Sequence, residues 1–164
     1  FLFLLYRFFA KNLHLIIWCK DMKITILNRE AVPEIIKGVA VYSIRFQCEW
    51  GTFTCGLVPQ HSENINTLCN QEIYVEASYQ QMVGFDILPS GSAPQIEQHQ
   101  NRFIVQGKII EKTLLESETL ITIETGNFHL TLSEKRTGKK FKKCQLGQHV
   151  KTEITGLILW DTGV

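Results

Sequence analysis

The sequence lacks the short motifs of the best-known catalytic and nucleotide-binding sites. It contains no glycine-rich phosphate loop, no Gly-x-Ser-x-Gly nucleophile elbow and no His-Glu-x-x-His zinc-binding helix. These absences exclude P-loop nucleotide-binding proteins, α/β-hydrolases and zincin-type metalloproteases. We therefore predict no catalytic residue, no cofactor and no metal site. A small enzyme with an unrecognised Cys/His site is kept as an alternative.

Uninterrupted apolar stretches long enough to span a membrane are also missing. The first 19 residues are mostly apolar, but four polar residues interrupt them: Arg7, Lys11, Asn12 and His14. A signal peptide would need a positive segment before the apolar run and small residues after it, and neither is present. We predict that residues 1–21 are non-native or peripheral and that Met22 begins the fold. An amphipathic or membrane-contacting helix and a signal are the alternatives, and a membrane is expected as partner only if residues 1–20 are native.

Cysteines are too few and too irregularly spaced for a disulfide framework. The chain has five: Cys19, Cys48, Cys55, Cys69 and Cys144. Small secreted domains more often carry an even and denser set. We therefore predict reduced thiols and a cytoplasmic location.

Neither basic nor acidic residues are in large excess: the chain has 17 Lys and Arg against 16 Asp and Glu, a net charge of +1. This balance excludes a strong overall attraction to nucleic acid or to an anionic membrane. The charges are nevertheless unevenly distributed: Met22 to His99 holds 4 basic and 8 acidic residues, and Gln100 to Val164 holds 10 basic and 7 acidic. An acidic half and a basic half favour head-to-tail docking or a charged ligand on one half only.

Helical periodicity is weak from Met22 onward, and short strand-like segments take its place. They are rich in β-branched and aromatic residues, as in Val39–Phe46, Glu72–Tyr79 and Leu120–Glu124. In the last of these, apolar and polar residues alternate, which is typical of a half-buried strand. The sequence therefore predicts an all-β fold.

Two parts of this β sequence resemble each other. Glu49-Trp-Gly-Thr-Phe aligns with Glu124-Thr-Gly-Asn-Phe at an offset of 75 residues, and flanking segments align at offsets of 69 and 77. Gly51 and Gly126 are expected as the first central residues of type II′ hairpin turns, which favour glycine. We predict a first β repeat at 22–88, a Pro-, Gly-, Ser- and Gln-rich linker at 89–101 and a second β repeat at 102–164. Chance similarity between two β segments is the alternative.

Each predicted repeat has the same order of elements: a long strand, a hairpin, a variable connection and two further strands. This order fits a five-stranded barrel of the oligonucleotide/oligosaccharide-binding type, and it fits half of a two-sheet sandwich equally well. Repeats of about 60 residues are marginally stable alone. We therefore expect the two to share one core or to pack tightly.

A Cys/His cluster in the first repeat is the nearest approach to a metal site. Its members are Cys48, Cys55, His61 and Cys69, separated by seven, six and eight residues. Recognisable zinc sites have closely paired ligands instead. The positions aligned with Cys48 and Cys55 are Ile123 and Leu130, so both cysteines are predicted to be core residues.

A basic segment in the second repeat is the strongest candidate binding site. Six basic residues and one aromatic residue fall within nine positions: Lys135, Arg136, Lys139, Lys140, Phe141, Lys142 and Lys143. Phosphate pairing combined with base stacking is how single-stranded nucleic acid is held. A solvated loop that protects an edge strand is the alternative.

Together these features predict a non-enzymatic binding or interaction module. The expected partner is single-stranded nucleic acid, bound through the basic segment. The alternative is a protein partner or a homo-oligomer, contacted through sheet edges or through the oppositely charged half of another copy.

Overall fold

The computed structural model describes residues 22–30 and 32–163. The prediction for residues 1–21 lies outside this part of the chain. The first six strands and a short 3₁₀ helix are β1 (Met22–Arg29), β2 (Glu34–Ile36), β3 (Val39–Cys48), β4 (Gly51–Val58), η1 (Ser62–Thr67), β5 (Glu72–Ser78) and β6 (Gln81–Ile87). The remainder are β7 (Gln95–His99), β8 (Arg102–Leu114), β9 (Thr119–Thr125), β10 (Phe128–Ser133), α2 (Glu134–Thr137), β11 (His149–Thr155) and β12 (Ile158–Asp161). Within the described residues, no helix has the length and apolar character needed to cross a membrane.

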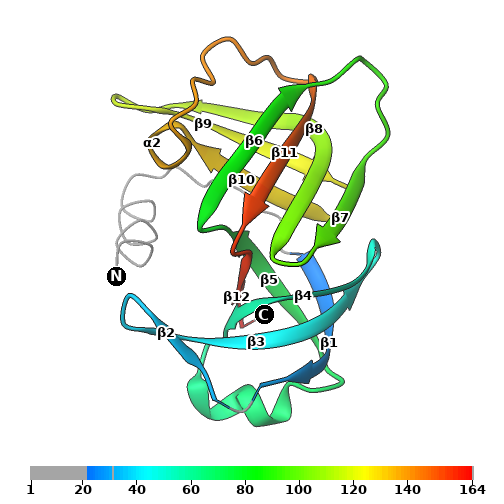
Figure 1. Ribbon diagram of the computed structural model, residues 1–164, viewed down its shortest axis with the longest axis vertical. Coiled ribbons are helices and arrows are strands. Elements are labelled where there is room, and N and C mark those ends of the chain that lie inside the picture. The colour runs from blue at the N-terminus through cyan, green and yellow to red at the C-terminus, as the bar shows by residue number, and fades with distance from the viewer. Residues whose placement is uncertain (1–21, 31, 164) are drawn as a thin grey trace.

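Five strands close into a barrel in the lower part of Figure 1. The sheet runs β1-β5-β12-β4-β3-β2, and an additional pairing between β1 and β3 closes it. The β4 and β12 strands are parallel, whereas the other barrel neighbours are antiparallel. This is the strand order of the oligonucleotide/oligosaccharide-binding barrel, with η1 between its third and fourth strands. The predicted all-β fold class is confirmed.

A second sheet lies above the barrel and runs β10-β9-β8-β11-β6, with β7 paired to β8. Its element order repeats that of the barrel: β8 takes the place of β1, the β9–β10 hairpin that of β3–β4, and β11 that of β5. The short helix α2 stands where η1 stands in the barrel.

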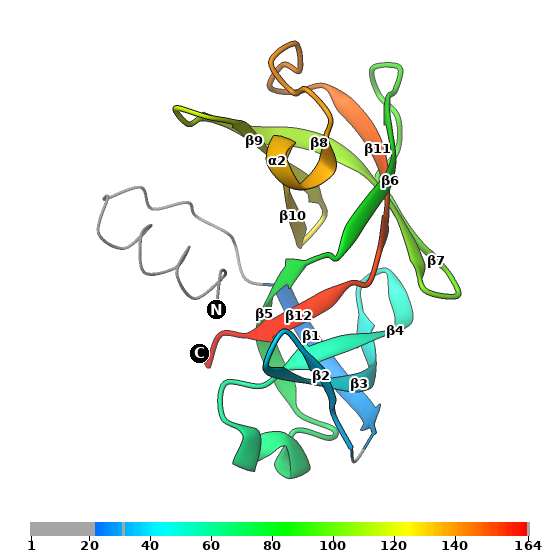
Figure 2. The same ribbon diagram turned by 60° about the vertical axis from the view of Figure 1, so that its left-hand side comes forward.

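The final strand of each sheet is supplied from the other part of the chain (Figures 1 and 2). The β5 strand of the barrel leads into β6, which pairs with β11 in the second sheet. The β11 strand of the second sheet leads into β12, which pairs with β4 and β5 in the barrel. Strand pairing therefore crosses the predicted boundaries at residues 88 and 102, and the predicted linker at 89–101 contains β7. The duplication itself stays a prediction.

The two hairpins differ in where they place their glycines. Cys48 pairs with Gly51 across the first turn, so Glu49 and Trp50 are its central residues and Gly51 follows them with a φ of 122°. In the second hairpin, Gly126 is a central residue with a φ of 58°. The prediction of two equivalent type II′ turns is therefore wrong for Gly51. The residue pairs that close the two turns are Cys48–Gly51 and Thr125–Phe128. They are 77 positions apart in the sequence, whereas the predicted alignment has an offset of 75.

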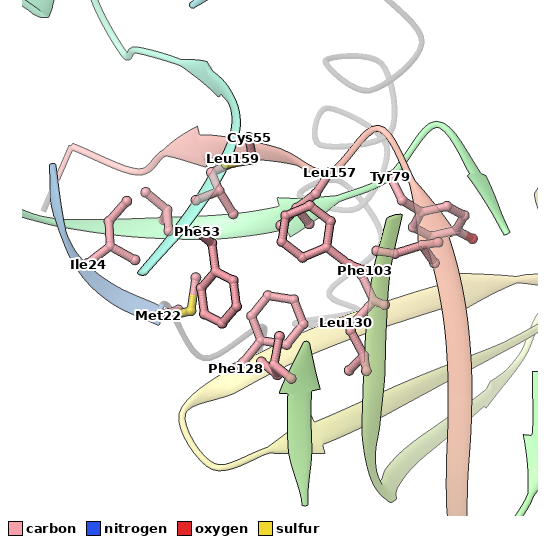
Figure 3. Packing of buried hydrophobic residues seen from close by; sticks show 14 of the residues in the cluster. Met22, Ile24, Phe53, Cys55, Tyr79, Phe103, Phe128, Leu130, Leu157 and Leu159 are labelled. Carbon is pink, nitrogen blue, oxygen red and sulfur yellow. The ribbon is translucent and has the colours of Figure 1, made fainter. Parts of the chain in front are cut away.

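The buried side chains of both sheets form one apolar cluster. Phe53 of β4 links the two sheets, because its ring centroid lies 5.8 Å from that of Phe46 in the barrel and 6.0 Å from that of Phe103 in β8. Figure 3 shows Phe53, Phe103 and Phe128 gathered between Met22 on one side and Leu130 on the other. The expectation of a shared core agrees with this packing.

Candidate ligand-binding site

A recess of about 280 Å³ lies where the barrel meets the second sheet. The barrel contributes residues of β2, β3, β4 and β12, and the second sheet contributes the start of β8. The two crossover segments, between β5 and β6 and between β11 and β12, supply Gln80 and Gly156. Both halves and both crossover segments therefore contribute to one recess.

The β2–β3 hairpin forms the outer wall of the recess. Lys37 and Gly38 have φ values of 50° and 80°, so the chain reverses tightly and Glu34 pairs with Val41. Because β2 pairs only with β3 among the described strands, it projects as a short edge strand beside the opening. Its residue Glu34 lines the recess with an exposed side chain.

Gly56 of β4 keeps the floor of the recess open. A Cβ atom at this position would lie 2.6 Å from Cγ1 of Val41 and 3.4 Å from Cγ1 of Ile158. The backbone N–H of Gly56 donates to the carbonyl oxygen of Leu157 at 3.1 Å, which attaches the second crossover to the barrel. Because a larger residue would push Val41 and Ile158 apart, glycine permits this close approach of strand and crossover.

Gln80 holds the two crossovers against each other. Its backbone N–H is shared between the carbonyl oxygens of Thr155 and Gly156, at 3.0 and 3.1 Å. These bonds connect the chain leaving β5 to the chain leaving β11. Gln80 and Gly156 therefore form a fixed wall of the recess.

The β7–β8 hairpin forms the opposite wall, and Gln98 attaches it to β4. The N–H of Thr54 donates to Oε1 of Gln98 at 2.9 Å, and Nε2 of Gln98 donates to the carbonyl oxygens of Thr54 at 2.7 Å and of Gln100 at 2.8 Å. The side-chain amide thus continues the hydrogen-bond ladder beyond the point where β12 stops pairing with β4. This docking places Asn101 and Phe103 on the recess.

The lining is mainly apolar, with hydrogen-bonding groups distributed over its walls. The neutral polar side chains are those of Ser43, Thr54, Gln80 and Asn101. Cys55 is buried, and burial raises the pKa of its thiol well above the ordinary value. No histidine is found among the described residues that line the recess. The described lining therefore combines an apolar surface with neutral hydrogen-bonding groups and a thiol of raised pKa.

The predicted Cys/His cluster does not form a metal site. Among the described residues, no group of three or more His, Cys, Asp and Glu side chains is arranged to hold a metal ion. Cys55 is buried and Cys48 is half-buried, and both belong to or pack against the apolar cluster. Burial also raises the pKa of the Cys48 thiol.

The predicted nucleic-acid residues lie in and after α2, and they do not line the recess. Phe141 is 0% exposed and packs on Phe85, with 5.3 Å between the ring centroids. The guanidinium of Arg136 lies 4.4 Å from the centre of the Tyr79 ring and donates to the Tyr79 carbonyl oxygen. The five lysines are exposed: Lys135, Lys139, Lys140, Lys142 and Lys143.

Glu134 explains why this segment turns inward at Phe141. Its buried carboxylate accepts hydrogen bonds from the backbone N–H groups of Phe141 and Thr119, the latter at 3.0 Å. These bonds lower the pKa of Glu134 despite its burial. The hydrogen-bonded turn holds Phe141 in the core, so Phe141 cannot stack on a base.

Sequence reasoning missed the residues that do form the recess. They come from segments far apart in the chain, from residue 32 to residue 158, and they share no motif. The exchange of the final strands brings them together, and no local pattern in the sequence indicates that exchange.

No protein-family model matches the sequence, and no curated protein matches it. Among solved structures, it is similar to ModG, which is described as a cytoplasmic molybdate-binding protein. The two chains are 10% identical with a TM-score of 0.48, and the alignment covers 85% of this chain and 93% of ModG.

The partner prediction is corrected. Single-stranded nucleic acid was expected to stack on Phe141, and that residue is in the core. The recess between the two sheets has the size of a small molecule and not of a macromolecule. The recess therefore fits neither a nucleic-acid strand nor a protein partner or second copy.

Proposed function

We propose that the protein is a non-enzymatic module that binds a small molecule in the recess between its barrel and its second sheet. The observation that carries the proposal is the composition of the walls: both halves and both crossovers contribute to one recess. A volume of about 280 Å³ lies just below the usual range of about 300–1,000 Å³ for small-molecule sites, so it suits a small ligand. The lining, mainly apolar with a few polar side chains, is also typical of such sites.

The walls are fixed by backbone and amide hydrogen bonds, and this supports a binding role. Gln98 fixes the β7–β8 hairpin to Thr54, and the N–H of Gln80 fixes the two crossovers. A site whose walls are already in place loses little conformational entropy when a ligand enters. The ligand is expected to present an apolar body to Val41, Phe103 and Leu157 and a hydrogen-bonding group to the polar side chains.

Binding is tested with N-phenyl-1-naphthylamine, a neutral probe whose fluorescence rises in an apolar site. We expect saturable fluorescence enhancement with the intact protein. In Ser43→Trp, an indole replaces an exposed side chain opposite Gly56 and fills the recess, so affinity should fall by about tenfold or more.

The matched control is Ser117→Trp, which places the same indole at an exposed position between β8 and β9. This variant should bind the probe as the unaltered protein does. The proposal fails if the intact protein gives no saturable signal, or if Ser43→Trp and Ser117→Trp bind equally well.

A further inference from the structure

The charge of the recess distinguishes between classes of small molecule, and this inference rests on the proposed function. Among the described residues that line the recess, Glu34 is the sole Asp, Glu, Lys, Arg or His. Its side chain is exposed at the outer wall of the recess. No salt bridge joins Glu34 to another described residue.

Nearby positive charges lie outside the lining. Lys37 is in the β2–β3 turn, beyond the paired residues of β2. Arg45 is on β3, directly opposite Thr54 and two positions beyond Ser43, and it is exposed. Neither residue lines the recess. Arg102, between Asn101 and Phe103, is also exposed and is paired with Glu153 at 2.9 Å. Among the described residues, the charged side chain that lines the recess is therefore Glu34.

We infer that the recess selects small ammonium compounds, with the apolar body inside and the positive group beside Glu34. An anion placed there would face a carboxylate, and it would find only neutral donors in Ser43, Thr54, Gln80 and Asn101. A charge-assisted hydrogen bond between an ammonium group and a carboxylate is stronger than one between neutral groups. Ser43 and Asn101 supply acceptor oxygens for further ammonium hydrogens.

The competitors for the test share one body and differ in charge: 2-phenylethylamine, 2-phenylethanol and phenylacetate. The affinity of each competitor is measured by its displacement of N-phenyl-1-naphthylamine from the protein at low ionic strength. The expected order of affinity is amine, alcohol, carboxylate. The ratio of amine to carboxylate should be about tenfold, because attraction and repulsion by the same charge both contribute. Raising the salt concentration should reduce the ratio.

Glu34→Gln should reduce the amine-to-carboxylate ratio to about one while leaving affinity for the neutral probe unchanged. Glu116→Gln removes an exposed carboxylate between β8 and β9 and should keep the ratio of the unaltered protein. Suppose that the neutral probe binds and that Ser43→Trp weakens its binding as expected. Equal affinities of the three competitors would then overturn the inference about charge and leave the proposed function standing. A ratio that survives in Glu34→Gln also overturns the inference. If the neutral probe does not bind, the proposed function and the inference both fail.

Discussion

Nε1 of Trp50 donates a hydrogen bond to the carbonyl oxygen of Thr125 at 3.0 Å, across 75 positions of sequence. The adjacent carboxylate of Glu49 accepts from the backbone N–H of Asn127. The tip of the barrel hairpin is therefore attached to the tip of the corresponding hairpin of the second sheet. This contact and the two crossovers hold the halves together around the recess.

Gly126 makes this hairpin contact possible. A Cβ atom there would lie 2.5 Å from Oε1 of Glu49 and 2.9 Å from Cζ2 of Trp50, in addition to the strain of a φ of 58°. Gly126→Ala should lower the free energy of unfolding by about 2–4 kcal/mol, combining backbone strain with the displaced contact. Gly138→Ala is the control, since Gly138 has a φ of 68° and open space around it. Equal losses in urea unfolding of the two variants would show that the hairpin contact contributes nothing.

The Gln98 amide should control the opening of the β7–β8 hairpin. Gln98→Ala removes one acceptor and one donor for the backbone of Thr54, at a cost of about 1–2 kcal/mol. Hydrogen exchange at the Thr54 amide should become faster, and affinity for N-phenyl-1-naphthylamine should fall as the wall loosens. Gln95→Ala, in the same hairpin, removes an amide that donates to Glu97, and it should change neither quantity. Unchanged exchange at Thr54 in Gln98→Ala would contradict the role of this amide.

Glu134 should make stability depend on pH. The N–H groups of Phe141 and Thr119 lower the pKa of this carboxyl below the ordinary value of 4.5. Its contribution is therefore complete above the ordinary pKa of the unfolded chain, and it is lost as pH falls through the lowered pKa of the folded chain. Glu134→Gln should be less stable than the unaltered protein at pH 7, and the difference should shrink below pH 4.5. A difference that is constant with pH would show that the charge of Glu134 is not what holds the turn.

The Cys55 thiol should react slowly while the protein is folded. Its burial excludes reagent, and the raised pKa lowers the thiolate fraction at pH 8. Alkylation by iodoacetamide, followed peptide by peptide in a mass spectrometer, should be at least about tenfold slower than in urea. Equal rates in the folded and unfolded protein would place Cys55 outside the core.

The β class and the barrel strand order could be predicted from the sequence, since both follow from local patterns. The short β-branched segments and the Glu-x-Gly-x-Phe pair mark strands and hairpins, and their order along the chain is that of the barrel. Local patterns do not say which of the strands completes which sheet. The exchange of β6 and β12 therefore could not be read from the sequence.

The candidate site could not be predicted for the same reason. Its walls depend on the exchange and on two amide contacts, those of Gln80 and Gln98, at positions that resemble ordinary loop residues in the sequence. Phe141 shows the opposite error. Its basic neighbours suggested an exposed aromatic residue, whereas the buried Glu134 carboxylate draws the turn inward and places the ring in the core.

The most direct test of the account is a ¹H–¹⁵N correlation spectrum recorded during titration with N-phenyl-1-naphthylamine. If the recess between the halves is the binding site, the amides of Gly56, Asn101 and Gly156 should shift together with one dissociation constant, while those of Lys139 and Lys143 stay in place. Shifts confined to one half of the chain, or centred on the basic segment, would contradict it.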